Sequence, residues 1–287
     1  MALADVWDLL DDVALVVSCR GTDELVRPLI DPTWPAELAR VLARADVVHV
    51  VADAVAGAVV ELGADPARVR VVRPAVDLAR WAGTPTPLDG PPWRLATVTR
   101  FVPAKGVEDL VAALAILRDG GVDATLRLVG EGPQEGALRL RARRAGLGDA
   151  VSFVGSGPTA LVAAELAAAH LYVSPSLSEG ISNGVLEAMA SGVAVVSTDV
   201  GGMGEVITQG VDGWLVPPGR PDQLARAVAD AVADPPATAS VAAAGRARVA
   251  SAFPRADQVS AWLAVYRDLG GQHTAAPARA AGEDRTP

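Results

Sequence analysis

The chain has 287 residues, 51% of them hydrophobic, a mean hydropathy of +0.30 and a formal net charge of −9. This composition is typical of a globular protein, and the negative charge argues against nucleic acid as a main partner and against docking on anionic lipid, because both need clustered Lys and Arg. The acidic start lacks a signal peptide's basic leader, no apolar run is long enough to span a membrane, and Cys19 is the only cysteine. We therefore expect a cytoplasmic protein without disulfides.

The first 81 residues carry three short β-branched runs with helical patterns between them. We expect strands at Val13 to Val17, Val47 to Val51 and Val69 to Val72, and a helix over Pro35 to Arg44. This alternation is typical of an α/β lobe with a parallel sheet. A complete lobe needs on the order of 100 to 150 residues, so 1–81 is expected to be a partial one. Its open sheet edge and apolar face call for a cover, either a partner chain or further sequence.

A proline-rich linker, 82–93, separates this part from a longer α/β pattern, because its four prolines interrupt both helix and central strand. Beyond it, short apolar runs alternate with amphipathic stretches. The expected strands are Leu95 to Thr99, Thr125 to Val129, Val151 to Val154, Leu171 to Val173 and Ala194 to Ser197. We expect a complete doubly wound domain over 94–252, with its ligand at the carboxyl ends of the strands.

The carboxyl-terminal part is expected to contain one more helix, 253–270. Its apolar side is predicted to pack back on the first lobe and comprises Val259, Trp262, Leu263 and Tyr266. Residues 271–287 show no apolar periodicity, so we expect a disordered tail.

The most informative segment runs from Ser174 to Gly192, S-P-S-L-S-E-G-I-S-N-G-V-L-E-A-M-A-S-G. It places Glu179 and Glu187 eight positions apart across a glycine-bearing turn that opens a helix. Gly180 lets the backbone approach a ligand closely, and the helix start aims unpaired N–H groups at an anion such as a diphosphate. The two carboxylates then border one pocket and accept hydrogen bonds from sugar hydroxyls. The segment predicts a nucleotide-sugar site.

Two basic residues, Arg100 and Lys105, follow an expected strand in V-T-R-F-V-P-A-K-G. On their own such residues are more often plain surface charges. At a strand's carboxyl end in an acidic protein, however, they suit a diphosphate. Neither a G-x-G-x-x-G after a strand nor a P-loop motif occurs, and no histidine has a second ligand at metal-binding spacing. We therefore expect no metal and no nicotinamide cofactor.

Six motifs occur in order along the chain: V-T-R-F-V-P-A-K-G, L-V-G-E-G-P, V-S-F-V-G, the Ser174 to Gly192 segment, V-V-S-T-D-V-G-G-M-G-E-V and D-G-W-L-V-P-P-G. From Leu95 to about Pro235 the chain resembles the glycosyl transferases group 1 domain of glycosyltransferase family 4, the retaining enzymes of the GT-B fold. The resemblance implies two Rossmann-like doubly wound domains. The amino-terminal one is incomplete, as in an amino-terminally truncated member.

The resemblance also implies roles for individual residues. The donor-binding set comprises Arg100, Lys105, Gly180, Ile181, Glu187, Gly130 and Val154. In it the two cations and the amides of Gly180 and Ile181 hold the diphosphate, and Glu187 binds the ribose. Glu179 contacts the donor sugar and is the expected catalytic residue. Arg20, in S-C-R-G-T-D, stands where many members have a histidine; an arginine is no base at neutral pH, but it suits an anionic acceptor or a phosphate.

The implied reaction transfers a sugar from a nucleotide diphosphate sugar to a lipid or saccharide acceptor, with retention at the anomeric carbon and without a metal. A lipid acceptor leaves room for peripheral membrane contact. Three alternatives stay open at this point. They are a catalytically silent nucleotide-sugar-binding module or partner subunit, a sugar-nucleotide epimerase, and a glycosidase that uses Glu179 and Glu187 as its two carboxylates.

Overall fold

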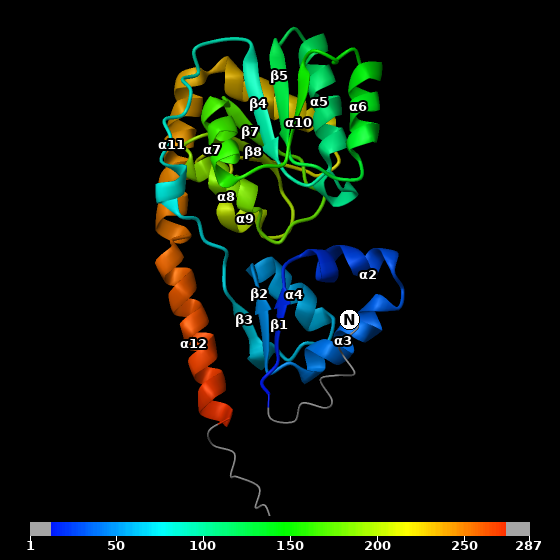
Figure 1. Ribbon diagram of the computed structural model, residues 1–287, viewed down its shortest axis with the longest axis vertical. Coiled ribbons are helices and arrows are strands. Elements are labelled where there is room, and N and C mark those ends of the chain that lie inside the picture. Colours follow the sequence, from blue (N-terminus) through cyan, green and yellow to red (C-terminus); the bar gives the residue numbers. More distant parts are fainter. Residues whose placement is uncertain (1–12, 274–287) are drawn as a thin grey trace, which may run out of the picture.

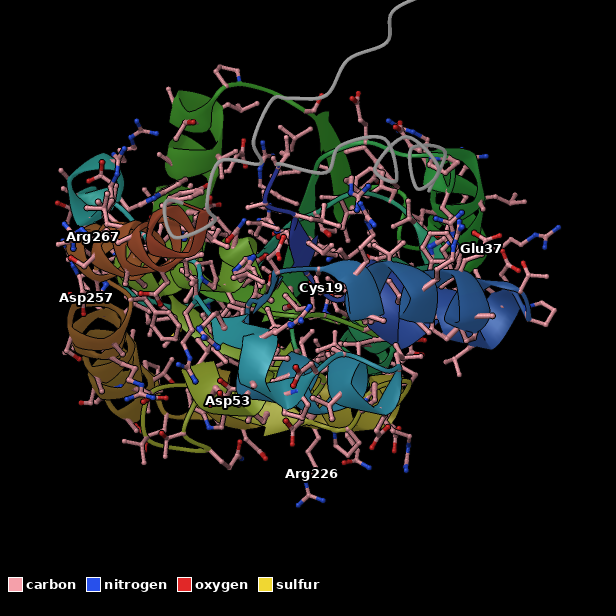
Figure 2. All side chains as sticks on the ribbon, turned by 90° about the horizontal axis from the view of Figure 1, so that it is seen from below. Cys19, Glu37, Asp53, Arg226, Asp257 and Arg267 are labelled. Carbon is pink, nitrogen blue, oxygen red and sulfur yellow. The ribbon has the colours of Figure 1, made fainter. Side chains whose placement is uncertain are left out.

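The structure is a computed structural model that describes residues 13–273. Two α/β lobes lie one above the other, and a rod of two successive helices, α11 and α12, runs along one side of both (Figure 1). Figure 2 views the molecule from below and labels Cys19 inside the smaller lobe, where it is buried, whereas the labelled Glu37 and Arg226 lie at the surface.

The larger lobe contains a six-stranded parallel sheet in the order β6-β5-β4-β7-β8-β9. Its strands are β4 (Trp93–Val98), β5 (Ala124–Val129), β6 (Val151–Gly155), β7 (Leu171–Ser174), β8 (Ala194–Thr198) and β9 (Trp214–Val216). Five of them were expected within two residues at either end. The last, β9, was missed because its three residues are too short to show a pattern. The α/β class with parallel sheets is confirmed.

Helices cover both faces of this sheet, as right-handed crossovers require. They are α5 (Val107–Asp119), α6 (Glu135–Arg144), α7 (Thr159–Ala168), α8 (Asn183–Ala190), α9 (Met203–Val206), α10 (Pro221–Ala233) and α11 (Pro235–Ala252). Successive strand residues point to opposite faces. Leu95 accordingly joins the apolar cluster beneath α5 and α10, whereas its neighbour Ala96 joins the cluster that contains α7 and α8 residues.

The smaller lobe contains a three-stranded parallel sheet in the order β1-β2-β3, with β1 (Val16–Cys19), β2 (Val47–Val50) and β3 (Val69–Val71). Its short helical segments are η1 (Thr22–Val26), α2 (Arg27–Ile30), η2 (Pro66–Arg68) and η3 (Leu78–Trp81), and its longer helices are α3 (Trp34–Arg44) and α4 (Asp53–Glu61). The first strand begins three residues later than expected. Residues from α3, α4 and the strands join one buried cluster that continues into the larger lobe, so the two lobes share an apolar core.

The terminal helix α12 (Arg255–His273) differs from its prediction in two ways. It extends to His273, so the first three residues of the expected tail are helical, while 274–287 lie outside the described residues. The predicted contact face is right only for Trp262, which packs against the small lobe: Val265 and Leu269 are buried against the small sheet, whereas Val259 and Tyr266 are 48% and 60% exposed. The sequence pattern was misleading because the helix has apolar residues around most of its circumference.

Candidate active site

The candidate site lies at the carboxyl ends of two adjacent strands. β4 pairs with β5 on one side and with β7 on the other, so the chain direction of the crossovers reverses between β4 and β7. In open α/β sheets this switch point forms a crevice that binds ligands. The two loops that follow β4 and β7 carry most of the residues expected to bind the donor.

The centre of the site is an ion pair between the two loops. Lys105 Nζ lies 2.5 Å from Glu179 Oε1, and Ser176 Oγ donates to the same oxygen at 2.9 Å. In the described part of the chain Glu179 Oε2 has no hydrogen-bond partner, so it is the oxygen that can accept from a ligand hydroxyl. Lys105 has three N–H donors and can serve an anion as well as Glu179.

Close backbone packing fixes this pair. Gly106 has a φ of 57°, and a Cβ there would lie 2.1 Å from the carbonyl oxygen of Pro175. The N–H of Leu177 also donates to the carbonyl oxygen of Ala104 at 2.8 Å. The loop carrying Lys105 is therefore held directly against the loop carrying Glu179, and no larger residue at Gly106 allows the same approach.

Unpaired amides adjoin the ion pair. Among the described residues, the N–H groups of Gly180 and Ile181 donate to no protein acceptor. Helix α8 begins two residues later, with Ser182 as its N-cap and no side chain capping it. A helix start and free backbone donors within three residues of each other form an arrangement suited to an anion.

The second carboxyl group, Glu187, lies one turn into α8 and is half-buried. Burial raises its pKa to about 7. The buried hydroxyl of Tyr172 has a pKa raised first by burial and further by the charges of both Glu179 and Glu187. Both carboxylates therefore act electrostatically on the Tyr172 hydroxyl. That the two border one pocket stays a prediction.

A pocket of about 300 Å³ opens beside Glu187. Its walls come from α8, the start of α7 and the segment that leads out of the small lobe. The lining includes Glu187 and Asn183 of α8, Arg80 and Trp81 of η3, and Gln258 of α12. The pocket is thus lined by residues of both lobes and of α12.

The other expected donor residues lie at nearby strand exits. Arg100 follows β4, is exposed and has no ion-pair partner among residues 13–273. Val154 lies in β6 and is partly exposed. Gly130 follows β5, and its N–H already donates to the carbonyl oxygen of Gly155 at 2.9 Å. A Cβ at Gly130 would lie 1.9 Å from the carbonyl oxygen of Thr99, so this glycine allows the close packing of two turns and does not donate its amide to a ligand.

Glycines also bring the small lobe into contact with the site. A Cβ on Gly180 would lie 2.6 Å from the carbonyl oxygen of Arg20, and one on Gly21 would lie 2.6 Å from the nitrogen of Gly180. On the other side of the loop, a Cβ on Gly201 would lie 1.8 Å from the carbonyl oxygen of Glu179, and Gly202 N donates to Gly180 O at 2.7 Å. The loop that carries Gly180 is therefore held by close backbone contacts with both lobes.

A polar network adds to this contact. Glu205 of the large lobe binds Arg73 of the small lobe at 2.7 Å and accepts from the N–H of Ala54, at the start of α4, at 3.0 Å. Arg73 also pairs with Asp53 at 2.6 Å. This network links the two lobes and is partly screened by solvent, because Arg73 and Asp53 are exposed.

Sequence reasoning missed Ser176, Gly201, Gly202 and Glu205. The last three lie in the motif V-V-S-T-D-V-G-G-M-G-E-V, which was used for the resemblance but was given no role at the site. The two adjacent glycines were the signal that a backbone approaches closely there. Among the described residues no group of three or more His, Cys, Asp or Glu could hold a metal ion, and no helix there has the length and apolarity that a membrane span needs.

Comparison with known proteins identifies the family. Residues 85–248, more than half of the chain, match the family described as glycosyl transferases group 1. The putative colanic acid biosynthesis glycosyltransferase WcaL of Salmonella typhimurium is 31% identical over 216 residues, which are 73% of this chain and 53% of the relative. Glycogen synthase of Mycobacterium tuberculosis is 35% identical over 201 residues, or 70% of this chain and 48% of the relative. The chain belongs to the glycosyl transferases group 1 family.

Solved structures agree with this assignment. Sucrose-phosphate synthase from Thermosynechococcus elongatus is similar with a TM-score of 0.80 at 26% identity, over 93% of this chain and 71% of that one. HepE of Anabaena, in complex with UDP-glucose, gives a TM-score of 0.81 at 22% identity over 94% and 76% of the two chains, a likeness of fold. The fold is of the GT-B glycosyltransferase type. The chain spans about half the length of the curated relatives it matches.

Proposed function

We propose that this chain binds a nucleotide diphosphate sugar in the crevice between β4 and β7 and transfers the sugar to a saccharide or lipid-linked acceptor. The observation that carries the proposal is the Lys105–Glu179 pair beside the free amides of Gly180 and Ile181. Such a set offers a cation and two N–H donors to a diphosphate, and a carboxylate oxygen to a sugar hydroxyl, within one loop junction.

In the proposed complex Lys105, Arg100 and the amides bind the diphosphate, Glu179 Oε2 accepts from a sugar hydroxyl, and Glu187 accepts from the ribose in the adjoining pocket. Transfer breaks the bond between the anomeric carbon and the diphosphate oxygen. The positive groups stabilise the charge that grows on the leaving diphosphate. A new bond forms to the acceptor oxygen, whose proton passes to the diphosphate. We propose retention at the anomeric carbon, as in family 4, and no requirement for a metal.

The place of the reaction is proposed to be the cytoplasm, with peripheral contact to a membrane if the acceptor is lipid-linked. A partner chain or further sequence that covers the small lobe is part of the proposal, because β1 has a paired neighbour on one side only. Whether this chain is active alone is therefore a separate question from whether it binds the donor.

Two measurements test the proposal. Calorimetric titration with UDP, GDP and ADP measures nucleotide binding, and incubation of the corresponding sugar nucleotides with saccharide and lipid acceptors measures transfer. We expect micromolar binding of one nucleotide, with loss of sugar-dependent affinity in Glu179→Gln and no loss in Glu61→Gln, an exposed control on the other lobe. No binding of any nucleotide would contradict the proposal.

The products separate the alternatives. Binding without transfer, in wild type and variants alike, indicates a silent module or partner subunit. Free sugar formed from a glycoside without an acceptor indicates a glycosidase. Glu179 is paired with Lys105, whereas burial raises the pKa of Glu187, so the two carboxyl groups differ as those of a glycosidase do. An altered sugar nucleotide formed without an acceptor indicates an epimerase. The ion pair of Glu179 with Lys105 favours the transferase, because it places a cation where a diphosphate leaves.

A further inference from the structure

A second pocket, of about 280 Å³, lies at the edge of the large sheet opposite the candidate active site. Its walls are the residues that directly precede β7 and β8, one face of α11 and the linker at 85–88. The donor loops follow the carboxyl ends of the strands, whereas this pocket lies at the amino ends of β7 and β8. The four residues of β7 separate the two places by about 13 Å. The pocket is therefore distinct from the donor site.

Most of the pocket wall is apolar. The linker side consists of Pro85, Pro87 and Leu88 around Thr86. A proline has no N–H group, so this side offers few hydrogen-bond donors. Thr86 holds the linker in place, because its N–H and its Oγ1 each donate to the carbonyl oxygen of Ala167 at 2.8 Å. The linker is thus a fixed apolar wall, which suits the apolar body of a ligand.

One cation lies on this apolar pocket. Arg246 of α11 is half-buried, and within the described part of the chain it has neither an ion-pair nor a hydrogen-bond partner. A Cβ on Gly192 would lie 3.5 Å from Cγ of Pro85 and 3.8 Å from Nη1 of Arg246, so the guanidinium group lies across Gly192 from the linker. The buried His170 also lines the pocket. Burial and the charge of Arg94 lower its pKa, so it adds no charge at neutral pH.

The surroundings of Arg246 provide no acceptor for its N–H groups. Arg248, two positions further along α11, instead donates to the carbonyl oxygen of Glu205 at 3.0 Å. Asp89 lies 3.8 Å from Nε2 of His170, is 72% exposed and forms no ion pair with Arg246. A half-buried guanidinium group has lost part of its hydration, and a ligand acceptor would restore the missing hydrogen bonds.

We propose that this pocket binds a small carboxylate with an apolar body, the carboxylate on Arg246 and the body along the linker wall. A guanidinium fork matches a carboxylate through two N–H groups. One permanent positive charge also balances one negative charge, whereas a phosphate ester carries nearly two at neutral pH. The linker and the rod of α11 and α12 are the places where the described chain passes between the lobes (Figure 1). A ligand in this pocket therefore contacts both connections and is a different molecule from the sugar nucleotide.

The experiment titrates four probes into the full chain by calorimetry: octanoate, 1-octanol as the neutral body, acetate as the head alone, and octyl phosphate. The test variants are Arg246→Gln and Ala243→Leu, because Ala243 is exposed, lines the pocket and lies three positions before Arg246 on one helix face. The matched controls are Ala247→Leu, which is exposed on α11 away from the pocket lining, and Arg226→Gln, a surface arginine labelled in Figure 2. Circular dichroism and Tm of each variant without ligand check that the fold is kept.

Octanoate should bind wild type and both controls at least about tenfold more tightly than 1-octanol, and acetate should show no measurable binding. Arg246→Gln should abolish the preference for octanoate over 1-octanol. Ala243→Leu should weaken both probes several-fold, because the leucine side chain occupies part of the pocket. Lys105→Ala should leave octanoate affinity unchanged, since Lys105 belongs to the donor site at the other edge of the sheet.

The inference fails if octanoate does not bind, if it binds no more tightly than 1-octanol, or if its advantage survives in Arg246→Gln. Tighter binding of octyl phosphate than of octanoate would overturn the carboxylate class. Loss of octanoate binding in Lys105→Ala would assign the anion to the donor site instead. None of these measurements involves a nucleotide, so their outcome is distinct from failure of the proposed function, in which no nucleotide binds.

Discussion

Nucleotide-sugar affinity should depend on pH through Glu187. Burial raises the pKa of this carboxyl group to about 7 from an ordinary value of 4.5. We proposed that the ionised form accepts from the ribose hydroxyls. The ionised fraction rises from about 9% at pH 6 to about 91% at pH 8 for a pKa of 7. If only this form binds productively, the apparent Kd falls about tenfold over that range.

Calorimetry with a sugar nucleotide at pH 6, 7 and 8 measures this effect. A sugar nucleotide is preferable to a free nucleoside diphosphate, because its diphosphate is esterified at both ends and does not titrate in this range. Glu187→Gln should bind more weakly than wild type at pH 8 and should show no pH dependence. An affinity that falls as the pH rises would refute the reasoning, since it would mean that the Glu187 charge repels the diphosphate.

The same carboxyl group links pH to folding. An acid whose pKa is raised by folding stabilises the native state at low pH, and this contribution is lost as the pH rises from 4.5 through about 7. The shift corresponds to about 3 kcal/mol, which we discount to roughly 1 to 2 kcal/mol because the group is only partly buried. Thermal unfolding should therefore show Glu187→Gln gaining a few degrees over wild type between pH 5 and pH 8. Parallel curves would contradict this.

Three further perturbations test the packing and charges of the site. Lys105→Ala should weaken diphosphate binding about tenfold or more while leaving circular dichroism and Tm nearly unchanged, and unaltered affinity would remove Lys105 from the site. Gly201→Ala should lower the free energy of unfolding in denaturant by about 2 kcal/mol or more, because its Cβ would lie 1.8 Å from the Glu179 carbonyl oxygen. The control Gly57→Ala, whose Cβ meets nothing within 4 Å inside α4, should raise the free energy of unfolding by about 0.5 to 1 kcal/mol. Glu205→Gln should increase amide hydrogen exchange at the start of α4, and should make the exchange rate there less sensitive to salt. Exchange rates equal to those of wild type would show that the shared apolar core alone holds the lobes together.

The sequence patterns predicted those features of the fold that interactions between neighbouring residues determine. Strand positions followed from β-branched runs, and the crevice followed from the order of loops after parallel strands. That Glu179 and Glu187 border one pocket was predicted from their spacing of eight positions across a turn and a helix start, and it stays a prediction. The pairing of Lys105 with Glu179 was not predicted, since it depends on Gly106 allowing two loops to touch.

Contacts between elements that are distant in the sequence could not be predicted from these patterns. The clamp around Gly180 involves Gly21 and Gly201, which are 159 and 21 positions away, and a glycine alone does not name its neighbour. The buried face of α12 was mispredicted for a related reason. Trp262 packs against the small lobe as predicted, but Tyr266 is exposed, and the small sheet buries Val265 together with Val47 and Val72. Periodicity locates a helix more reliably than it selects the packed side.

The clamp connects donor binding to the arrangement of the lobes. The amides of Gly180 and Ile181 are free to bind an anion, while the carbonyl oxygen of Gly180 is held by Gly202 and its Cα faces the small lobe. A diphosphate bound to these amides therefore contacts a loop that cannot shift without disturbing both lobes. The same contact holds the backbone of Arg20 against this loop. An incomplete small lobe would consequently impair acceptor binding more than donor binding, because the donor loop keeps both of its glycine contacts within the described chain.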